Sequence, residues 1–463
     1  MTGFLLGPAP VADVDEYLAS GPGGLGLATA REIGPSATIE RVRASGLRGR
    51  GGGGFLTGAK WAGIAGQESA RRYVVCNGAE GEPGTFKDRA LIRSNPYQVV
   101  EGLFIAAFAI AARDVYICVK ASYSRELERL TRAVEELQQR GLGEDLTVSL
   151  VAGPDDYLFG EEKAMLEVIE GKPAMPRAFP PHEQGLFAWS PELGWESTPV
   201  AIGSRRDDPH PTLVNNVETL SNVPHILARG DEWFRSMGTA SSPGTIVCTV
   251  VGDVVAPDVG EIELGTPLGG AIDAVGSGLY PGRSVKAVFS GVANAVVTGS
   301  QLDTPLSYEG MEAIGSGLGS AGLIVYDDTA CMVEVAYRFS DFLAVESCGQ
   351  CSPCKLGSTE ITARLDRIEA GLGSDADLEV VSAWLRRVTD ASRCYLATEE
   401  QTVVSSILRT FPEEFAEHLE RHRCPHRRSL ALPKLVDLQD GRATYAGHDD
   451  VTPPVRSRGL GNE

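Results

Sequence analysis

Three closely spaced cysteines constrain this chain more than any other feature. They are Cys348, Cys351 and Cys354, in the pattern C-x2-C-x2-C. Structural zinc usually takes its thiolates as separated pairs, whereas three cysteines this close suit one face of an iron–sulfur cube. A fourth ligand must come from elsewhere, and Cys394, at the start of the last predicted helix, is the natural choice. The pattern predicts a [4Fe–4S] cluster held by these four residues, and structural zinc is the alternative.

The cysteines lie in a part of the chain that is predicted to be helical. From residue 327 to 424, apolar residues recur at helical spacing and mark four helices with short connections, which is typical of a bundle. The last of these helices is predicted to carry on one face Val404, Ile407, Phe411, Phe415 and Leu419. The tail, residues 425–463, is expected to contain a hairpin over residues 436–445 and to be disordered over its last dozen residues.

The first half of the chain alternates between strands and helices. The chain has 463 residues, too many for one hydrophobic core, so several domains are expected. After an N-terminal extension (1–37), residues 38–240 contain predicted strands at 73–76, 115–119 and 146–151, with helices at 97–112 and 124–140. Such alternation predicts an α/β domain with helices covering a sheet. Short β-rich segments with many Gly and Pro residues predict a small α+β domain over residues 244–326.

A glycine-rich loop lies near the start of the predicted α/β domain. Residues 49–54 match the pattern G-x-G-x-x-G, but a helix is predicted before them instead of a strand, so an ordinary Rossmann fingerprint is not favoured. Such a loop can bring backbone N–H groups close to an anionic or planar ligand. Arg50 and Lys60 could neutralise phosphates there, and Phe55 could stack on a ring. The alternative is a flexible surface turn.

Another candidate segment, residues 76–89, follows the first predicted strand. Ligands of α/β folds bind at the carboxyl ends of strands, where this segment begins. Asn77 offers an amide, and Glu80 and Glu82 offer carboxylates for ribose hydroxyls. The alternative is a helix-capping loop with solvated acids.

Two more segments are predicted to begin helices. Residues 160–162 begin one after the third strand, and residues 211–220 begin another. In the second segment Asn215, Asn216 and Thr219 can cap the helix. Adjacent Asn residues are also good partners for a flavin ring or a phosphate, so both interpretations stay open.

The net charge and the apolar runs of the chain exclude two classes of partner. The formal net charge is −20, and binding to nucleic-acid backbones needs a basic footprint, so no nucleic-acid partner is expected. The longest apolar run, residues 103–112, is far short of the about 20 residues of a membrane helix, and no secretory signal is visible. We therefore expect a cytoplasmic protein without direct membrane insertion, and any peripheral link to the inner membrane would be made through partner subunits.

Together the motifs resemble one known family. They are GLRGRGGGGFLTGAKW at 46–61, CNGAEGEPGTFKDR at 76–89, YLFGEE at 157–162, PTLVNNVETL at 211–220 and ESCGQCSPCKLG at 346–357. Over residues 12–424 the chain is similar to the NADH-binding flavoprotein subunit of respiratory complex I and to its relatives in NAD-dependent formate dehydrogenases and NAD-reducing hydrogenases. The resemblance implies a Rossmann-like FMN- and NADH-binding domain (38–240), a ubiquitin-like domain of the soluble-ligand-binding type (244–326) and a four-helix bundle with a [4Fe–4S] cluster (327–424).

The resemblance also implies an activity. An NADH dehydrogenase of this family passes a hydride from NADH to FMN, and then single electrons through the cluster to partner subunits, with no catalytic acid or base in the hydride step. The implied partners are a small thioredoxin-like [2Fe–2S] subunit and a larger iron–sulfur or catalytic subunit. Two alternatives stay open. The same module could work in reverse and reduce NAD in a formate dehydrogenase or hydrogenase, or the chain could be a scaffold electron-transfer subunit that has lost nucleotide turnover.

The resemblance assigns the cofactors to particular residues. Those expected to bind NADH are Gly49, Arg50, Gly51, Gly54, Phe55, Thr57, Gly58, Lys60, Glu82 and Phe179. Those expected to bind FMN are Gly49, Arg50, Gly51, Lys60, Asn77, Tyr157, Gly160, Glu161, Glu162, Asn215, Asn216 and Thr219. The cluster ligands are Cys348, Cys351, Cys354 and Cys394. The chain departs from the family pattern at Ala79, where Asp is usual, at Lys120, Phe159 and Lys163, and in the atypical sequence of residues 182–210.

Overall fold

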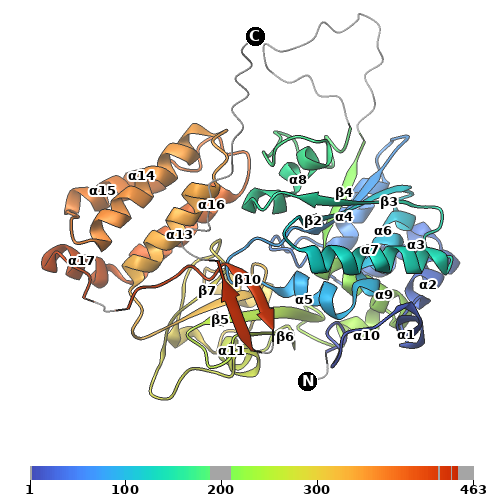
Figure 1. Ribbon diagram of the computed structural model, residues 1–463, viewed down its shortest axis with the longest axis horizontal. Coiled ribbons are helices and arrows are strands. Elements are labelled where there is room, and N and C mark those ends of the chain that lie inside the picture. Colours follow the sequence, from blue (N-terminus) through green and yellow to red (C-terminus); the bar gives the residue numbers. More distant parts are fainter. Residues whose placement is uncertain (1–2, 188–209, 426–427, 440, 447–463) are drawn as a thin grey trace, which may run out of the picture.

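The computed structural model describes residues 3–187, 210–425, 428–439 and 441–446. In these residues an α/β part, a five-stranded part and a helical part pack side by side, and a hairpin follows the helical part (Figure 1). Most of the atypical segment 182–210 and the last dozen residues lie outside the described residues. None of the helices that the structure describes is both long and apolar enough to cross a membrane.

A parallel four-stranded sheet organises the α/β part. Its strands are β1 (Tyr73–Gly78), β2 (Asp114–Lys120), β3 (Thr147–Gly153) and β4 (Thr212–Asn216), in the order β3-β2-β1-β4. All neighbouring pairs are parallel, which confirms the predicted Rossmann-like architecture. The prediction that residues 211–220 begin a helix was wrong for the first half of this segment, which is β4; the helix begins only at Val217. A buried run this short shows no period that distinguishes a strand from a helix.

Helices cover both faces of this sheet. They are α1 (Val14–Ala19), α2 (Leu25–Ile33), α3 (Pro35–Ala44), α4 (Thr57–Ala65), α5 (Lys87–Ser94), α6 (Pro96–Ala109), α7 (Ser124–Gln139), α8 (Glu162–Ile169), α9 (Val217–Arg229) and α10 (Asp231–Arg235), with the 3-10 helix η1 (Tyr157–Gly160) before α8. Successive strand residues point to opposite faces. Val74 and Cys76 of β1 therefore pack in one core with α2, α6, α7 and α9, whereas Tyr73 and Val75 pack in another core with α8.

A buried carboxylate anchors the N-terminal helices to this part. Glu101, on α6, accepts hydrogen bonds from the Tyr17 hydroxyl (2.6 Å) and from the N–H groups of Gly24 (2.7 Å) and Leu27 (2.8 Å) at the start of α2. A carboxylate at this position accepts from N–H groups that have no partner within the helix. The positive end of the helix dipole also stabilises its negative charge. Helices α1 and α2 of the predicted N-terminal extension thus pack on the α/β part.

The second part is built on a mixed sheet. Its strands are β5 (Thr245–Gly252), β6 (Asp258–Glu263), β7 (Val285–Ser290), β8 (Val297–Thr298) and β9 (Gly322–Asp327), in the order β6-β5-β9-β7-β8. The central strands β5 and β9 run parallel, and the other pairs are antiparallel. The connections contain α11 (Leu268–Gly276), η2 (Gly299–Gln301) and α12 (Tyr308–Ala313). This arrangement is the predicted ubiquitin-like α+β fold.

The third part is helical, as predicted. It contains α13 (Met332–Glu346), α14 (Ser352–Glu369), α15 (Asp375–Leu385), α16 (Leu396–Thr410) and α17 (Pro412–Arg421). The last predicted helix is divided into α16 and α17, because Phe411 leaves the helical conformation and Pro412 starts a new helix. Proline suits the first turn of a helix but cannot continue one. The predicted hairpin is present as β10 (Leu435–Gln439) and β11 (Arg442–Tyr445).

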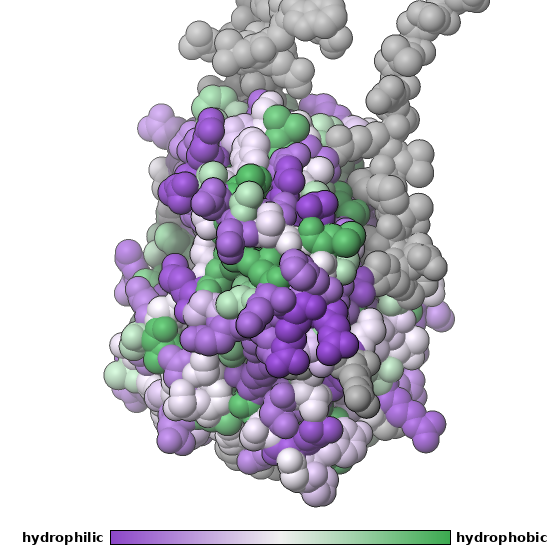
Figure 2. Space-filling view, turned by 90° about the vertical axis from the view of Figure 1, so that its left-hand side faces the viewer, coloured by the Kyte–Doolittle hydropathy of each residue, from purple (hydrophilic) through white to green (hydrophobic). Residues whose placement is uncertain are grey.

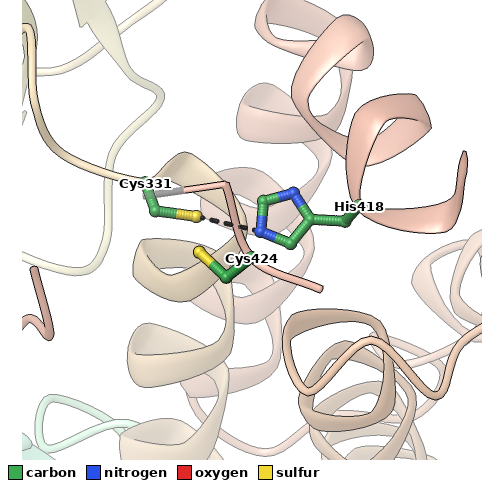
Figure 3. Close-up of side chains that lie close together, drawn as sticks. All are labelled: Cys331, His418 and Cys424. Carbon is green, nitrogen blue, oxygen red and sulfur yellow. Dashed lines mark hydrogen bonds between the residues drawn. The ribbon is translucent and has the colours of Figure 1, made fainter. Parts of the chain in front are cut away.

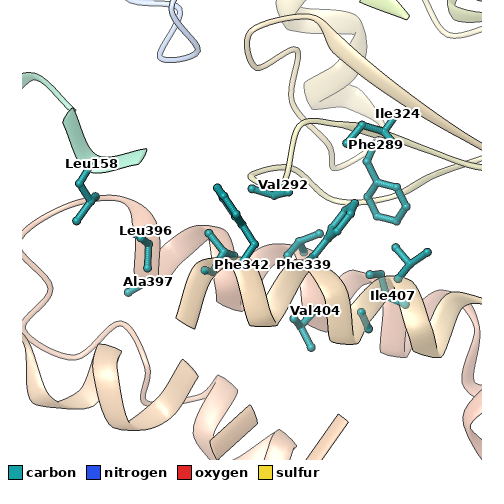
Figure 4. Close-up of a cluster of buried hydrophobic side chains, with 14 of the residues drawn as sticks. Leu158, Phe289, Val292, Ile324, Phe339, Phe342, Leu396, Ala397, Val404 and Ile407 are labelled. Atoms are coloured by element: carbon teal, nitrogen blue, oxygen red, sulfur yellow. The ribbon is translucent and has the colours of Figure 1, made fainter. Parts of the chain in front are cut away.

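One hydrophobic core joins the three parts (Figure 4). Phe289 of β7 packs against Phe339 of α13, with ring centroids 5.0 Å apart. Leu158 of η1 and Leu396 of α16 belong to the same cluster of buried side chains. Close packing of this kind fixes the parts relative to one another, so residues from all three can contribute to one site.

Candidate functional site

The strand order of the parallel sheet reverses between β1 and β4. From β1 the chain moves outward to β2 and β3 and then crosses back to β4, on the other side of β1. Open α/β sheets bind ligands in the crevice outside the carboxyl ends of the strands at such a switch point. Asn77 of β1 and Asn216 of β4 are paired at this end, and Asn77 Nδ2 donates to the Gly160 carbonyl at 2.7 Å. Three predicted FMN-binding residues therefore lie together at this edge.

A buried charge network, which the sequence did not reveal, supports this edge. Lys87 Nζ lies 2.7 Å from Asp88 Oδ1 and 3.0 Å from Glu218 Oε2. Lys87 also donates to Asn216 Oδ1 (3.1 Å), and Asn216 Nδ2 donates to Asp88 Oδ2 (2.6 Å). Burial raises the pKa of Asp88 to about 6, although the charge of Lys87 acts in the opposite direction. The network holds Asn216 in place. Lys87 was missed because it begins a charged helix whose sequence resembles a solvated surface.

The glycine loop is held by a residue of the five-stranded part. The Gly49 N–H donates to the Phe55 carbonyl at 2.8 Å and closes the loop. Tyr308, on α12, donates its hydroxyl to the Gly49 carbonyl at 2.7 Å. A Cβ on Gly54 would lie 2.5 Å from the Tyr308 ring, and Gly54 has a φ of +60°. This position therefore requires glycine, both for its conformation and for the close approach of the tyrosine.

The outer side of the glycine loop is open. A Cβ on Gly52 or Gly53 would meet nothing within 4 Å, and Phe55 is 63% exposed. A Cβ on Gly51 would lie 3.0 Å from the Cβ of Asn216, so the loop lies against the switch point. Accessible backbone next to an exposed aromatic ring suits a planar ligand.

The Arg50 side chain does not have the predicted role. It is fully buried, and its guanidinium donates to the carbonyls of Arg48 (3.0 Å), Pro243 (3.3 Å) and Thr245 (3.0 Å). The expectation that this guanidinium neutralises a phosphate is therefore wrong, because it connects the loop to the five-stranded part. The Arg50 N–H donates to Thr219 Oγ1 at 2.9 Å, so Thr219 holds the loop backbone.

Helix α4 begins directly after the glycine loop. Its N-cap residue offers no side-chain acceptor. The Thr57 N–H donates to the Leu47 carbonyl at 2.9 Å, and the N–H groups that follow it and the positive end of the dipole suit an anion. The Thr57 hydroxyl is buried without a hydrogen-bond partner among the described residues. A Cβ on Gly58 would lie 2.5 Å from Arg43 Cα, so glycine lets α4 pack closely on α3. Lys60 Nζ lies 2.8 Å from Glu162 Oε2, at the start of α8. The glycine loop and the start of α4 fit a phosphate-bearing planar cofactor.

A tyrosine joins a half-buried carboxylate, Glu82, to a buried one, Glu399, where the three parts meet. Tyr157, in η1, donates to Glu82 Oε2 at 2.6 Å and lies 3.2 Å from both carboxylate oxygens of Glu399 on α16. The Val292 N–H, after β7, donates to Glu82 Oε1 at 2.7 Å. Burial raises the pKa of both carboxyls, and the charge of Glu82 adds to the rise at Glu399. Glu399 was not predicted, because nothing in the local sequence indicates this contact.

Two other predicted FMN ligands make hydrogen bonds within the protein. Asn215 Oδ1 accepts from Trp61 Nε1 at 2.8 Å. Glu161 accepts from the N–H groups of Lys163 and Ala164 (both 3.0 Å) and so caps α8. Burial raises the pKa of Glu161 to about 7. The contacts of Asn215 and Glu161 with FMN stay predictions.

Two more residues, Glu80 and Phe179, were predicted to contact the nucleotide. Glu80 is buried, and its carboxylate accepts from Arg89 Nε (2.9 Å) and from the Asp88 N–H (3.0 Å), so its assignment to a ribose hydroxyl is wrong. Phe179 lies in the segment after α8 with an exposed ring. The hydrogen bonds and ring contacts of the described residues do not connect it to the loop, and its role stays a prediction.

The four predicted cluster ligands line one cavity in the helical part. Cys348 and Cys351 lie between α13 and α14, Cys354 is in the first turn of α14, and Cys394 precedes α16. The rest of the wall includes Leu158, Pro176, Leu396 and Ala397. Packing of α16 against α13 and α14 thus brings Cys394 to the other three thiols.

The arrangement of these thiols favours a cluster over zinc. Ligand atoms on one tetrahedral zinc ion lie within about 4 Å of one another, because each lies about 2.3 Å or less from the ion. No three of the four cysteines have their sulfur atoms this close together. Among the described residues, the one group of three metal-binding side chains with all ligand atoms within 4.8 Å does not include any of them. The four cysteines instead surround a cavity, which suits a [4Fe–4S] cube. Burial raises the pKa of Cys394 to about 12, and bound iron would act in the opposite direction.

A lysine that departs from the family pattern connects the sheet edge to this cavity. Lys163, in the first turn of α8, donates from Nζ to the carbonyl of Arg393, the residue before Cys394. Ser347 also lines the cavity, and its Oγ lies 3.5 Å from Cys354 Sγ. Hydrogen bonds to cluster sulfurs change the reduction potential, so Ser347 is a candidate for this role.

Two family models match parts of this chain. Residues 42–225 match the family model of the Nuo51 FMN-binding domain, and residues 334–418 match that of the NADH-ubiquinone oxidoreductase-F iron–sulfur binding region. The first model covers the glycine loop and the parallel sheet, and the second covers the four cysteines.

Individual relatives span nearly the whole chain. An F-type subunit of the NADH-quinone oxidoreductase of Rhizobium meliloti is 38% identical over 405 residues, which are 85% of this chain and 91% of the relative. The HndC subunit of the NADP-reducing hydrogenase of Solidesulfovibrio fructosivorans is 34% identical over 428 residues, 90% of this chain and 83% of the relative. Among solved structures, a chain of NAD+-reducing [NiFe]-hydrogenase is 31% identical with a TM-score of 0.76, and the match covers 90% of this chain and 68% of that chain.

Proposed function

The chain belongs to the family of NADH-binding flavoprotein subunits of respiratory complex I, and on this basis we propose that it oxidises NADH and delivers single electrons to partner subunits. One observation carries the proposal. A glycine loop lies at the switch point of a parallel sheet, and one hydrophobic core joins this sheet to the helical part, where four thiols surround a cavity. When bound, FMN supplies a hydride acceptor and a [4Fe–4S] cluster supplies single-electron transfer.

The residues of this chain would act by positioning the two planar rings. Gly51 and Gly54 keep the loop thin and in place against the sheet edge, and the exposed Phe55 ring can cover the nicotinamide. The uncapped start of α4 offers N–H groups to a phosphate, and Lys60 adds a charge nearby. Hydride transfer between stacked rings requires no protein acid or base, so exclusion of water and correct geometry are the contribution of these residues.

We also propose that electrons leave through the helical part. Leu356 and Tyr395 follow cluster ligands closely in the sequence and are 58% and 61% exposed. Figure 2 shows that this end of the molecule carries apolar residues spread among hydrophilic ones. By their names, the relatives are subunits of larger enzymes. The proposed partners are a small thioredoxin-like [2Fe–2S] subunit and a larger iron–sulfur or catalytic subunit, in the cytoplasm or held at the inner membrane by such partners.

The proposal is tested with the whole chain, loaded anaerobically with FMN and the iron–sulfur cluster. NADH is expected to bleach the flavin absorbance and then to produce the EPR signal of the reduced cluster. Dithionite added to a second sample verifies that both cofactors can be reduced. Cofactors that respond to dithionite but to neither NADH nor NADPH would overturn the proposed activity and favour a scaffold subunit.

Two relatives favour the opposite direction as a second candidate function. One is a subunit of an NADP-reducing hydrogenase, and the other belongs to an NAD+-reducing hydrogenase. In such an enzyme the same site would reduce the nicotinamide with electrons from another subunit. Purification from the native host with its partners distinguishes the two directions. A bound hydrogenase or formate dehydrogenase subunit supports nucleotide reduction, whereas quinone-reducing membrane subunits support NADH oxidation.

A further inference from the structure

A second group of metal-binding side chains lies away from the cluster cavity. Cys331 is the N-cap residue of α13, His418 is on α17, and Cys424 follows α17 (Figure 3). Their ligand atoms all lie within 4.8 Å of one another, and Cys331 Sγ is 3.4 Å from His418 Nε2. A thiolate and an imidazole nitrogen on one tetrahedral zinc ion are about 3.6 Å apart. The spacing therefore matches a single ion.

His418 has the orientation of a metal ligand. Its Nδ1 lies 2.7 Å from the Glu414 carbonyl, one turn earlier, so Nδ1 carries the proton and the Nε2 lone pair is directed toward Cys331. Metal-binding histidines almost always donate their other N–H in this way. Cys331 and His418 are fully buried, whereas Cys424 is half-buried. A site with two buried ligands and one accessible ligand allows an ion to enter and a water molecule to complete its shell.

We propose that Cys331, His418 and Cys424 bind one Zn2+ ion, with water as the fourth ligand. Two sulfurs and one imidazole form a donor set that zinc prefers and that Mg2+ and Ca2+ do not. Binding involves no electron transfer. The two thiols release their protons to solvent and form two Zn–S bonds, and Nε2 of the neutral imidazole forms the third bond.

The zinc ion would hold the point from which the tail crosses the molecule. Beyond Cys424, the Leu430 N–H donates to Glu334 Oε1 of α13 at 2.9 Å. Further along, the Gly84 N–H donates to the Pro433 carbonyl at 2.8 Å, and Arg89 Nη1 donates to the Leu435 carbonyl at 3.1 Å. The tail thus reaches the segment that follows β1. Attachment of the tail at Cys424 would help to order residues 428–439, whether or not the chain oxidises NADH.

Metal analysis of the whole chain, purified anaerobically with its iron, tests this proposal. We expect about one zinc per chain in addition to the iron. Replacement of zinc by Co2+ should produce the d–d absorption of a tetrahedral thiolate site. Cys331→Ser and Cys424→Ser should each lower the zinc content at least about tenfold and leave the iron content unchanged. Cys248→Ser, at a buried cysteine of β5, is the matched control and should keep the zinc.

Measurements on the unaltered chain keep the proposal testable if a variant does not fold. Removal of zinc by a chelator, with iron content monitored, should raise deuterium uptake in residues 428–439. Unchanged uptake after zinc loss would refute the link between the ion and the tail. If the iron-loaded protein is incubated with Zn2+ and retains no zinc, the proposed site is refuted. A Cys331–Cys424 disulfide, detected as an intact mass lower by two hydrogens, would do the same.

Discussion

The glycine loop (residues 49–54) and the cysteine loop (residues 348–354) present different groups to a ligand. The glycine loop presents backbone, and distant side chains hold it, because Tyr308 donates to the Gly49 carbonyl and Thr219 accepts from the Arg50 N–H. The cysteine loop presents its own thiols and takes one further ligand, Cys394, from another segment. The first site therefore depends on the shape of the loop, and the second depends on four individual side chains. An added methyl group should harm the first site, and a lost sulfur should harm the second.

Cys394→Ser should have the largest effect, because a hydroxyl is a much poorer iron ligand than a thiolate. The iron content should fall at least about tenfold, and the cluster EPR signal should disappear. Bleaching of bound FMN by NADH should remain, since the glycine loop lies in another part of the molecule. Cys248→Ser controls for loss of a buried thiol outside the cavity. Simultaneous loss of flavin bleaching in Cys394→Ser would contradict the independence of the two sites.

Gly54→Ala should have the next largest effect. The new Cβ would lie 2.5 Å from the Tyr308 ring, at a residue with a φ of +60°. The strain is about 1–2 kcal/mol before Tyr308 moves, so the Kd of FMN should rise about 5- to 30-fold in a fluorescence titration. Gly53→Ala is the matched control, because its Cβ would meet nothing within 4 Å. Equal weakening by both substitutions would mean that Tyr308 does not determine the binding shape of the loop.

Glu400→Gln should have the smallest effect, and it probes the surroundings of the cysteine site. Glu400 is fully buried on α16, and Ser340 donates to its Oε1 at 2.6 Å. Burial raises the pKa of Glu400 from 4.5 to about 8. The folded chain therefore binds more protons than the unfolded chain between these pH values, and the stability of the unaltered protein should fall as pH rises through this window. The Tm of the variant should exceed that of the unaltered protein by about a few degrees at pH 8.

The difference in Tm should disappear near pH 5, where Glu400 is protonated in the folded chain and carries no charge. Thermal unfolding at several pH values, under anaerobic conditions, measures this effect. Glu379→Gln, at an exposed acid of α15, should show no comparable dependence on pH. A difference between Glu400→Gln and the unaltered chain that is the same at pH 5 and pH 8 would contradict the explanation by burial.

Local sequence patterns were sufficient to predict most of the helices and strands. The apolar residues of α7 recur along one face, and Leu130, Val134 and Leu137 are buried as this pattern predicts. The strand β4 was missed because its buried run is too short to show a period. The break between α16 and α17 was also missed, although Pro412 is a signal that could have indicated it. The family resemblance, carried by ordered motifs, indicated the cofactors that such a fold would hold.

What the sequence determined by itself is therefore local: three thiols on one turn, a loop of glycines, and the alternation of strands and helices. Only the tertiary structure decided that Arg50 is directed into the protein, that Lys87 supports Asn216, and that Tyr157 joins Glu82 to a residue of α16. It also brought together Cys331, His418 and Cys424, which have no common motif. The physical reason is that a sequence pattern reports interactions between neighbours along the chain. Contacts between remote side chains depend on how the finished elements pack.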